Sequence, residues 1–265
     1  MSTRLPVRKT YKLFVGGSFP RSESGRTLEI EGYNVARASR KDAREAVVAA
    51  RKAVAGWSGA TAYNRGQVLY RLAETMETRT AALAAASSGR REVARAIDRV
   101  VWYAGWADKL AQVLGSSNPV AGPYFNFTLP EPTGVVALVA PDEPALDGLV
   151  ARLAPAIVGG NAVVVVASEL HPLAAIELAE AVATSDVPGG VVNVLTGLRS
   201  ELAPVLAGHM DVNAIDVTGA DGDRAALEEL AAENVKRVVR AKDDQSPWEI
   251  ASFMELKTVW HPIGR

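Results

Sequence analysis

Short apolar runs alternate with helical segments through the second half of the chain. Short runs rich in Val, Ile, Leu and Ala predict buried strands at residues 135–139, 162–166, 191–195, 214–217 and 235–239. Apolar residues at helical spacing predict helices at residues 146–158, 173–183, 202–206 and 224–232. Strands that are apolar on both faces and alternate with helices are typical of a parallel sheet covered on both sides. The pattern therefore predicts an α/β fold with a doubly wound, Rossmann-like parallel sheet.

The first part of the chain has a different pattern, dominated by amphipathic helices. A short strand is predicted at residues 11–16, where a weak alternation ends in a Gly-Gly turn. Ser39 is a candidate N-cap for a first helix, since Asp42 falls in its first turn. Apolar stripes at helical spacing predict three helices, at residues 47–57, 69–83 and 97–114. We expect an N-terminal helical segment that precedes the parallel sheet.

Two further strands are predicted outside this alternation. Residues 124–129 (YFNFTL) alternate with period two, after a loop of Gly, Ser, Asn and Pro at 115–123. In the tail, the even-numbered residues from 254 to 260 fall on one side of a strand, which must pair with another strand. We therefore divide the chain into an N-terminal strand and helices (1–122), an arm strand (123–131), a Rossmann-like part (132–250) and a C-terminal strand (251–265).

Composition and charge exclude several classes of protein. The chain of 265 residues is 48% hydrophobic and 22% charged, as in globular domains. Its 29 basic residues balance 30 acidic ones, so the net charge gives no indication of binding to nucleic acid or to an anionic membrane. No apolar run reaches the length of a membrane span and residues 1–10 lack a signal-peptide core, so a cytoplasmic protein is expected. The absence of cysteine excludes disulfides, thiolate metal ligands and thiol nucleophiles from this chain.

Motifs that carry chemistry are scarce. No GxGxxG follows the first strand of the α/β part, and the chain contains neither a P-loop nor a GxSxG turn. Trp102, Tyr103 and Trp106 could stack on a cofactor, but their spacing favours packing between helices. Asp142 and Glu143 are adjacent and could share a proton, although neighbouring carboxylates in a loop are usually solvated. The residues alone indicate a possible nucleotide cleft at the carboxyl ends of the strands.

Several segments resemble those of the aldehyde dehydrogenase family. The family's coenzyme-binding domain is similar to the segment that begins at Pro132 (PTGVVALVAPDEPALDGLVARLAPAIVGGNAVVVVASELHPL). Further similar segments follow in the family's order, namely VPGGVVNVLTG (187–197), IDVTGA (215–220) and NVKRV (234–238). The family's N-terminal part is similar to AVVAARKAVAGW (46–57), and its C-terminal oligomerisation strand to FMELKTVWHPIGR (253–265). The chain is therefore identified as a truncated member that has the coenzyme-binding domain and the oligomerisation strand but lacks the catalytic domain.

Positions that matter for the family's chemistry differ in this chain. The resemblance places Asp142 and Glu143 where the family has Trp-Asn, whose asparagine helps to bind the oxyanion. The family's general base aligns with Ala241, and the two glycines that follow it align with Asp243 and Asp244. The nucleophilic cysteine has no counterpart. We therefore assign no catalytic residue and expect no family-type aldehyde oxidation by this chain alone.

The cofactor positions are changed as well. Val166 stands where the family has the lysine that binds the adenosine ribose, and Ala220 replaces the serine beside the pyrophosphate. The resemblance leaves five candidate cofactor-binding residues, Ser168, Glu169, Gly197, Thr218 and Gly219. Of these, Glu169 could accept a hydrogen bond from a ribose hydroxyl. The resemblance thus implies either no cofactor or weak NAD(P) binding.

The retained strands lead to two main hypotheses about function. In the family, the segment corresponding to 124–129 and the C-terminal strand form an arm that adds to the sheet of a neighbouring subunit's catalytic domain. The first hypothesis is a non-catalytic, structural or regulatory subunit that docks on a full-length aldehyde dehydrogenase subunit through these two strands. The alternatives are that the arm folds back locally or pairs with a second copy. No nucleic-acid or membrane partner is expected.

The second hypothesis is an NAD(P)-binding oxidoreductase component. It would be a split dehydrogenase, with a partner that supplies the thiol, or a nucleotide sensor. A third and weaker hypothesis is acid/base hydrolysis by the carboxyl groups of Asp142 and Glu143.

Overall fold

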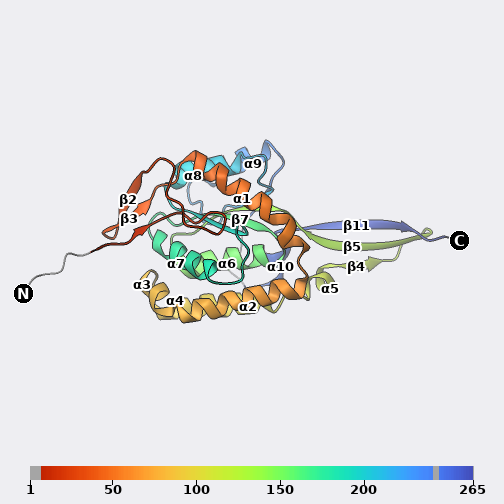
Figure 1. Cartoon of the computed structure of the whole chain (residues 1–265). Coiled ribbons are helices and arrows are strands. Elements are labelled where there is room, and N and C mark those ends of the chain that lie inside the picture. Colours follow the sequence, from red (N-terminus) through yellow and green to blue (C-terminus); the bar gives the residue numbers. More distant parts are fainter. Residues whose placement is uncertain (1–6, 241–244, 265) are drawn as a thin grey trace, which may run out of the picture.

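The computed structural model describes residues 7–240 and 245–264, and a five-stranded parallel sheet forms the centre of its body (Figure 1). The strands are β6 (Val135–Val139), β7 (Ala162–Val166), β8 (Val192–Leu195), β9 (Ala214–Asp216) and β10 (Arg237–Val239). Their spatial order is β10-β9-β6-β7-β8, and every neighbouring pair is parallel. Along the chain, the central strand β6 therefore comes first. β7 and β8 then extend the sheet to one edge, and β9 and β10 extend it to the other. This doubly wound order confirms the predicted α/β fold.

Helices cover both faces of this sheet. One face carries α1 (Arg40–Gly59), α8 (Arg199–Ala207) and α9 (Arg224–Ala232), whereas the other carries α6 (Ala145–Val158) and α7 (Pro172–Ala183) (Figure 1). Because β6 and β7 are buried on both sides, their sequences VVALV and AVVVV are continuous apolar runs without polar alternation.

The alternation of side chains along the strands separates two hydrophobic cores. Val136 and Leu138 of β6 belong to the core beneath α6 and α7, whereas Val135 and Val139 belong to the core beneath α1 and α8. All four side chains are fully buried. Burial of one such side chain stabilises the fold by roughly 1.5–3 kcal/mol. The central strands therefore hold both helical layers in place.

A second helical layer packs outside α6 and α7. It consists of α2 (Ala62–Thr78), α3 (Thr80–Ala85), α4 (Arg90–Ala104) and α5 (Leu110–Leu114). Within it, α4 packs against α6 and α2 against α7. The helix predicted over residues 97–114 is interrupted, because α4 ends at Gly105 and turns separate it from α5. Glycine has one of the lowest helix propensities, which accounts for the break.

The aromatic residues at the end of α4 pack between helices. The rings of Trp102 and Tyr103 meet edge-on with their centroids 4.9 Å apart, and Trp106 packs against Trp102. Tyr103 is fully buried, and both tryptophans are partly buried against the same core. This arrangement favours the packing interpretation over a cofactor-stacking surface.

A small N-terminal sheet lies beside the body, with strands β1 (Thr10–Tyr11), β2 (Thr27–Ile30) and β3 (Tyr33–Ala36) in the order β1-β3-β2. The predicted strand at residues 11–16 is therefore shorter than expected. The hairpin between β2 and β3 was not predicted. Its two-residue turn, Glu31 and Gly32, has positive φ values of 52° and 75°, as a primed hairpin turn requires.

Ser39 caps α1, as predicted. Its Oγ accepts hydrogen bonds from the backbone N–H groups of Lys41 and Asp42, and Asp42 accepts one from Ser39 N at 2.7 Å. This reciprocal capping box satisfies backbone groups that the helix itself leaves unpaired. Asp42 also accepts hydrogen bonds from Ser22 Oγ and Glu23 N, so the same carboxylate fastens the loop before β2 to the start of α1.

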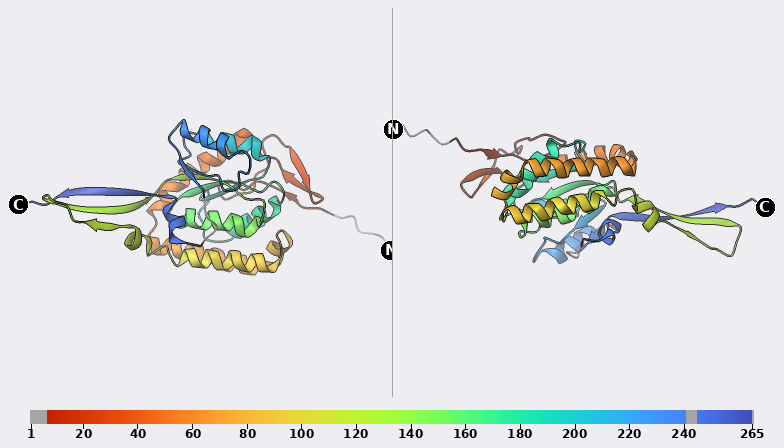
Figure 2. Two further views of the ribbon diagram at one scale, coloured as in Figure 1. Left: turned by 180° about the vertical axis from the view of Figure 1, so that it is seen from behind. Right: turned by 90° about the horizontal axis from the view of Figure 1, so that it is seen from below.

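An arm of three antiparallel strands projects from the body, and the end of the chain lies at its tip (Figures 1 and 2). The strands are β4 (Ser116–Asn118), β5 (Tyr124–Pro132) and β11 (Met254–Pro262), in the order β11-β5-β4. The tail therefore pairs with the predicted strand at 124–129, which extends to Pro132. The loop expected at 115–123 contains β4, a short polar strand that carries no apolar alternation.

Buried polar contacts anchor the base of the arm. Asn161 accepts a hydrogen bond from Gly134 N at 2.8 Å and donates one to Phe253 O at 3.0 Å, which fixes the starts of β6 and β11 together. Arg152 of α6 pairs with Glu249 of α10 (Pro247–Ala251) at 2.7 Å, and both side chains are at most 8% exposed. The short helix before β11 is thus held by a buried ion pair.

Removal of one member of this pair is expected to destabilise the fold. Glu249→Ala leaves the Arg152 guanidinium buried without its main counter-ion, so the free energy of unfolding should fall by about 3 kcal/mol. The matched control is Glu74→Ala, which removes an exposed pair with Arg71 and should change it by less than about 1 kcal/mol. Urea denaturation of both variants tests this, and equally small effects would contradict it.

Candidate functional site

The strand order of the sheet defines a crevice at the carboxyl ends of β6 and β9. The chain passes from β6 to β7 on one side and later returns to β9 on the other, so the turns after β6 and β9 diverge. Ligands of open α/β sheets bind at such a switch point. Since β5 leads into the amino end of β6, this crevice lies at the end of the body away from the arm (Figure 1).

Asp142, in the turn after β6, binds three groups. Its Oδ1 accepts hydrogen bonds from Ser168 Oγ at 2.7 Å, Glu169 N at 3.1 Å and Arg199 Nη2 at 3.1 Å. Desolvation acts to raise the pKa of Asp142, but the hydrogen bond from Ser168 and the charge of Arg199 outweigh it, and the pKa is lowered. A proton shared with Glu143 would raise the pKa of one of the two carboxyl groups. Asp142 instead acts as a carboxylate that ties three turns together.

Ser168 and Glu169 follow β7 directly, and contacts within the chain engage both side chains. Ser168 Oγ donates to Asp142 and accepts a hydrogen bond from His171 N at 2.9 Å. The Glu169 carboxylate accepts one from the backbone N–H of Arg199, the first residue of α8. A carboxylate at this position also interacts favourably with the helix dipole. The candidate ribose acceptor is therefore already part of a helix terminus.

Thr218 and Gly219 follow β9, and they lie on the side of the turn after β6 that is opposite to Ser168 and Glu169. Thr218 N donates to Asp216 Oδ1 at 2.8 Å. Gly219 packs so closely on Ala140 that a Cβ atom would lie 2.3 Å from its carbonyl oxygen. Gly197, after β8, has a φ of +149° and lies against the backbone of Ala38. Close packing within the chain thus requires glycine at 197 and 219.

The five candidate cofactor residues come from the turns after β7, β8 and β9. Ser168 and Glu169 lie together with Asp142 and Arg199, whereas Thr218 and Gly219 lie beyond the turn after β6. A cavity of about 160 Å³ lies between that turn, α6 and the turn after β9. It is lined by Pro141, Glu143, Pro144, Gly148, Ala151, Arg152 and Thr218. Its volume is smaller than the roughly 300–1,000 Å³ of typical small-molecule sites.

Three residues near the crevice were not among the predicted site residues. Arg199 binds both Asp142 and Ala140 O, and Arg152 is 2% exposed on α6. Asp216 ends β9, and its Oδ2 is buried with no hydrogen-bond partner among the described residues. The sequence could have indicated Asp216, since it is the only charged residue of the predicted strand at residues 214–217.

Other chemistry is limited within the described part of the chain. Residues 7–240 and 245–264 contain no cluster of three or more His, Cys, Asp or Glu side chains that could hold a metal ion. No helix of these residues is long and apolar enough to cross a membrane. Ala241, Asp243 and Asp244, which align with the family's general base and glycines, lie outside the described residues.

Asp216 gives a pH-dependent prediction. Burial raises its pKa, against the hydrogen bond from Thr218 and the charge of Arg152. At a pH between the two pKa values, the Asp216 carboxyl is therefore protonated in the folded chain and ionised in the unfolded chain. The free energy of unfolding consequently falls as pH rises from the pKa of the unfolded chain to that of the folded chain. Asp216→Asn should raise Tm by about 2–4 °C at pH 7 and by less at pH 4.

Thermal unfolding of the wild-type chain and of Asp216→Asn at pH 7 and pH 4 provides the measurement. The control is Asp221→Asn, an exposed substitution in the turn after β9, which should give the same small change at both pH values. A loss of stability in Asp216→Asn at pH 7 would show instead that Arg152 holds a charged Asp216.

Comparison with known proteins places this architecture among aldehyde dehydrogenases. The profile of the aldehyde dehydrogenase family matches residues 28–261. The chain is 31% identical to cytosolic aldehyde dehydrogenase 1 of Elephantulus edwardii, over 96% of its own length and 54% of that protein. It is 33% identical to retinal dehydrogenase 2 of Gallus gallus, over 92% and 50% of the two lengths.

Solved structures give the same result. PnpE from Pseudomonas sp. WBC-3 matches with a TM-score of 0.80 and 30% identity, over 87% of this chain and 50% of that one. An aldehyde dehydrogenase from Bacillus cereus, solved as an NAD+ complex, matches with a TM-score of 0.80 and 25% identity over the same shares. The chain spans about half the length of the relatives that it matches. Since the family match covers most of its residues, this chain belongs to the aldehyde dehydrogenase family.

Proposed function

We propose that this chain is a non-catalytic subunit that docks on a full-length aldehyde dehydrogenase subunit through its arm. The observation that carries the proposal is the open edge of β11 on a chain that contains no cysteine nucleophile. Without a thiol, the chain cannot form the covalent intermediate that the family's reaction requires. Its contribution would therefore be to assembly, stability or substrate access in the complex.

The edge of β11 differs from the edges of the body's sheet. β8 has four residues, and Phe14 bridges to its Val194 through two backbone hydrogen bonds of 2.9 and 2.7 Å. β10, at the opposite edge, has only three residues. β11 has nine residues and, among the described residues, pairs with β5 on one side only. Long unpaired edges invite pairing with another chain, and proteins usually shorten or cover them.

Exposed apolar side chains accompany this edge. Those at least 36% exposed are Tyr124, Phe125, Leu129, Leu256, Val259, Trp260 and Ile263. In the antiparallel register Leu256 and Trp260 share one face of the arm, on which Trp260 packs edge-on against Tyr124. Clustered apolar exposure of this kind marks an interaction surface. Both the backbone edge and the side chains therefore favour a protein partner.

The family resemblance specifies the type of partner. In aldehyde dehydrogenases the corresponding arm adds to the catalytic-domain sheet of a neighbouring subunit, and this chain offers the arm without such a domain. Pairing of two β11 edges from two copies of this chain is the competing arrangement. Main-chain hydrogen bonds would provide affinity in either case, and the alternating side chains would provide specificity.

Substitutions in β11 test the docking. The chain is co-expressed with a full-length aldehyde dehydrogenase from its own organism, and the complexes are weighed by native mass spectrometry. The wild-type chain should form a mixed oligomer, and the double variant Leu256→Asp with Trp260→Ser should lower its yield at least about tenfold. The matched control is Leu170→Asp, at a leucine 60% exposed on the opposite end of the body, which should assemble normally.

Two outcomes would contradict the proposal. A homo-oligomer that the β11 variant disrupts, with no mixed complex, would assign the arm to a second copy. Equal assembly of the wild-type chain and the β11 variant would remove the arm from the interface altogether. Far-ultraviolet circular dichroism of each variant establishes that the body remains folded.

Weak NAD(P) binding is a second candidate role, favoured by the Bacillus cereus relative that was solved with NAD+. The strand order and the crevice are those of a dinucleotide-binding sheet. The residues within the crevice fit the cofactor only in part. Glu169 caps α8, Arg199 is paired with Asp142, and the cavity of about 160 Å³ is small for a dinucleotide. Affinity in the millimolar range is therefore expected.

Calorimetry measures this second role separately from assembly. Titration with NAD+ should give weak heats, and Asp142→Asn should strengthen binding a few-fold because it removes a negative charge from the crevice that would repel the negatively charged pyrophosphate of NAD+. The absence of heat for both proteins at millimolar NAD+ and NADP+ would exclude the role. Such a result would leave the docking proposal unchanged.

A further inference from the structure

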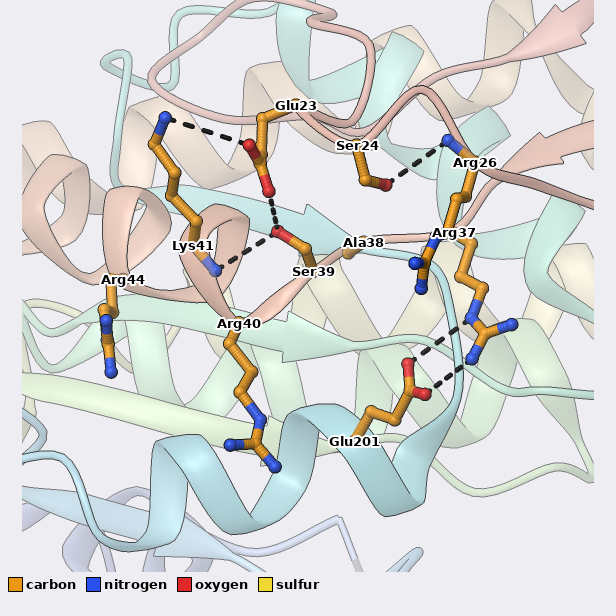
Figure 3. A pocket seen from close by; sticks show the side chains of 10 residues that line it. All are labelled: Glu23, Ser24, Arg26, Arg37, Ala38, Ser39, Arg40, Lys41, Arg44 and Glu201. Atoms are coloured by element: carbon orange, nitrogen blue, oxygen red, sulfur yellow. Dashed lines mark hydrogen bonds and ion pairs between the residues drawn. The ribbon is translucent and has the colours of Figure 1, made fainter.

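A hollow of about 440 Å³ lies beside the start of α1, the loop before β2 and the first turn of α8 (Figure 3). Five cationic side chains line it, and we name it the basic hollow after them: Arg26, Arg37, Arg40, Lys41 and Arg44. Two carboxylates, Glu23 and Glu201, also line it. A chain with a net charge of −1 thus concentrates positive charge at one place.

Hydrogen bonds fix the walls of the basic hollow. The carboxylate of Asp42 holds the loop that contains Glu23, and Ser39 Oγ donates to Glu23 Oε1 at 2.9 Å. On the opposite wall, the backbone N–H of Ala38 donates to Thr196 O at 2.8 Å, which ties the start of α1 to the turn before α8. The hollow is therefore part of the folded frame and not a gap between mobile side chains.

Two of the five cations are neutralised by the carboxylates. Arg37 forms a two-point contact with Glu201, and Lys41 lies 3.8 Å from Glu23 (Figure 3). The hydrogen bond from Arg37 lowers the pKa of Glu201, and the charges of Arg26 and Arg40 lower it further. Both of those guanidinium groups therefore act on the same space.

Three arginines remain. Arg26, Arg40 and Arg44 are exposed, and none forms an ion pair with another side chain in the described residues. They come from the loop before β2 and from two successive turns of α1, and Figure 3 shows their guanidinium groups spread around the hollow. Like charges held around one hollow repel each other, and an anion bound between them would relieve this repulsion.

The basic hollow is separate from the crevice at the ends of β6 and β9. Arg199 and Glu201 are two residues apart in the first turn of α8, so they point to different sides of the helix. Arg199 binds Asp142 in the crevice, whereas Glu201 binds Arg37 in the hollow. None of the five candidate cofactor residues lines the hollow.

The geometry points to a binding site for a phosphate-bearing small molecule in the basic hollow. A guanidinium group donates paired hydrogen bonds to oxyanions, and arginine is favoured wherever phosphate is recognised in this way. A planar carboxylate has two oxygens to offer, whereas a terminal phosphate has three that point in different directions. Three arginines spread around one hollow therefore match a ligand with several phosphate oxygens better than a single carboxylate.

The volume of the basic hollow limits the size of the ligand. A volume of about 440 Å³ falls within the range of roughly 300–1,000 Å³ that small-molecule sites occupy. This is more space than one inorganic phosphate fills, so the ligand carries a second phosphate or an organic group.

The test is calorimetric titration of the full chain with inorganic pyrophosphate at low salt. Pyrophosphate should bind the wild-type chain, and Arg40→Gln with Arg44→Gln should weaken binding at least about tenfold through loss of two charged donors. The matched control is Arg90→Gln with Arg91→Gln, which removes the same charge from exposed positions at the start of α4. The control should bind like the wild-type chain.

Three results would overturn the assignment. Equal weakening in both double variants would mean that pyrophosphate responds only to net charge. Citrate that binds as tightly as pyrophosphate would show a general anion surface without preference for phosphate. Absence of binding to the wild-type chain at millimolar pyrophosphate would remove the site. All four substituted arginines are exposed, so the variants should melt at the wild-type temperature.

Discussion

Every strand needs hydrogen-bond partners for its backbone, and this requirement organises both parts of the molecule. In the body, β6 and β7 each lie between two neighbours, and helices cover both faces of the sheet. The outer strands of that sheet are short, so few backbone groups are left unpaired. In the arm, β5 lies between β4 and β11, but β11 has an open side. The longest open strand edge in the described part of the chain thus lies in the arm.

The centre of the body was predictable because β6 and β7 are apolar on both faces. β6 and β7 occupy the predicted residues, since runs such as AVVVV have no polar position that would allow another arrangement. β10 begins later than predicted because Val235 has a φ of +56° and is 93% exposed, so this valine belongs to a turn. The hairpin of β2 and β3 was missed because Glu31-Gly32 is not one of the strong turn pairs such as Asn-Gly.

The candidate site was less predictable, for a physical reason. The position of Ser168 and Glu169 after a buried strand follows from local sequence, but their partners do not. Glu169 meets Arg199, 30 residues further along the chain, and Asp142 meets Arg199 across 57 residues. Such contacts depend on how the turns converge at one end of the sheet. A resemblance to a family indicates which positions meet a ligand in relatives, but not which of them contact each other in this chain.

The short connection between arm and body fixes the direction in which the arm projects. Only Thr133 and Gly134 separate β5 from β6, and Asn161 bonds to the backbone at Gly134 and Phe253. The arm is therefore a stiff extension of the central strand. A subunit held on the edge of β11 would stand at one end of the sheet, and both the crevice and the basic hollow would face away from it. Assembly would leave these two surfaces open to solvent, and small molecules could enter and leave them while the complex stays intact.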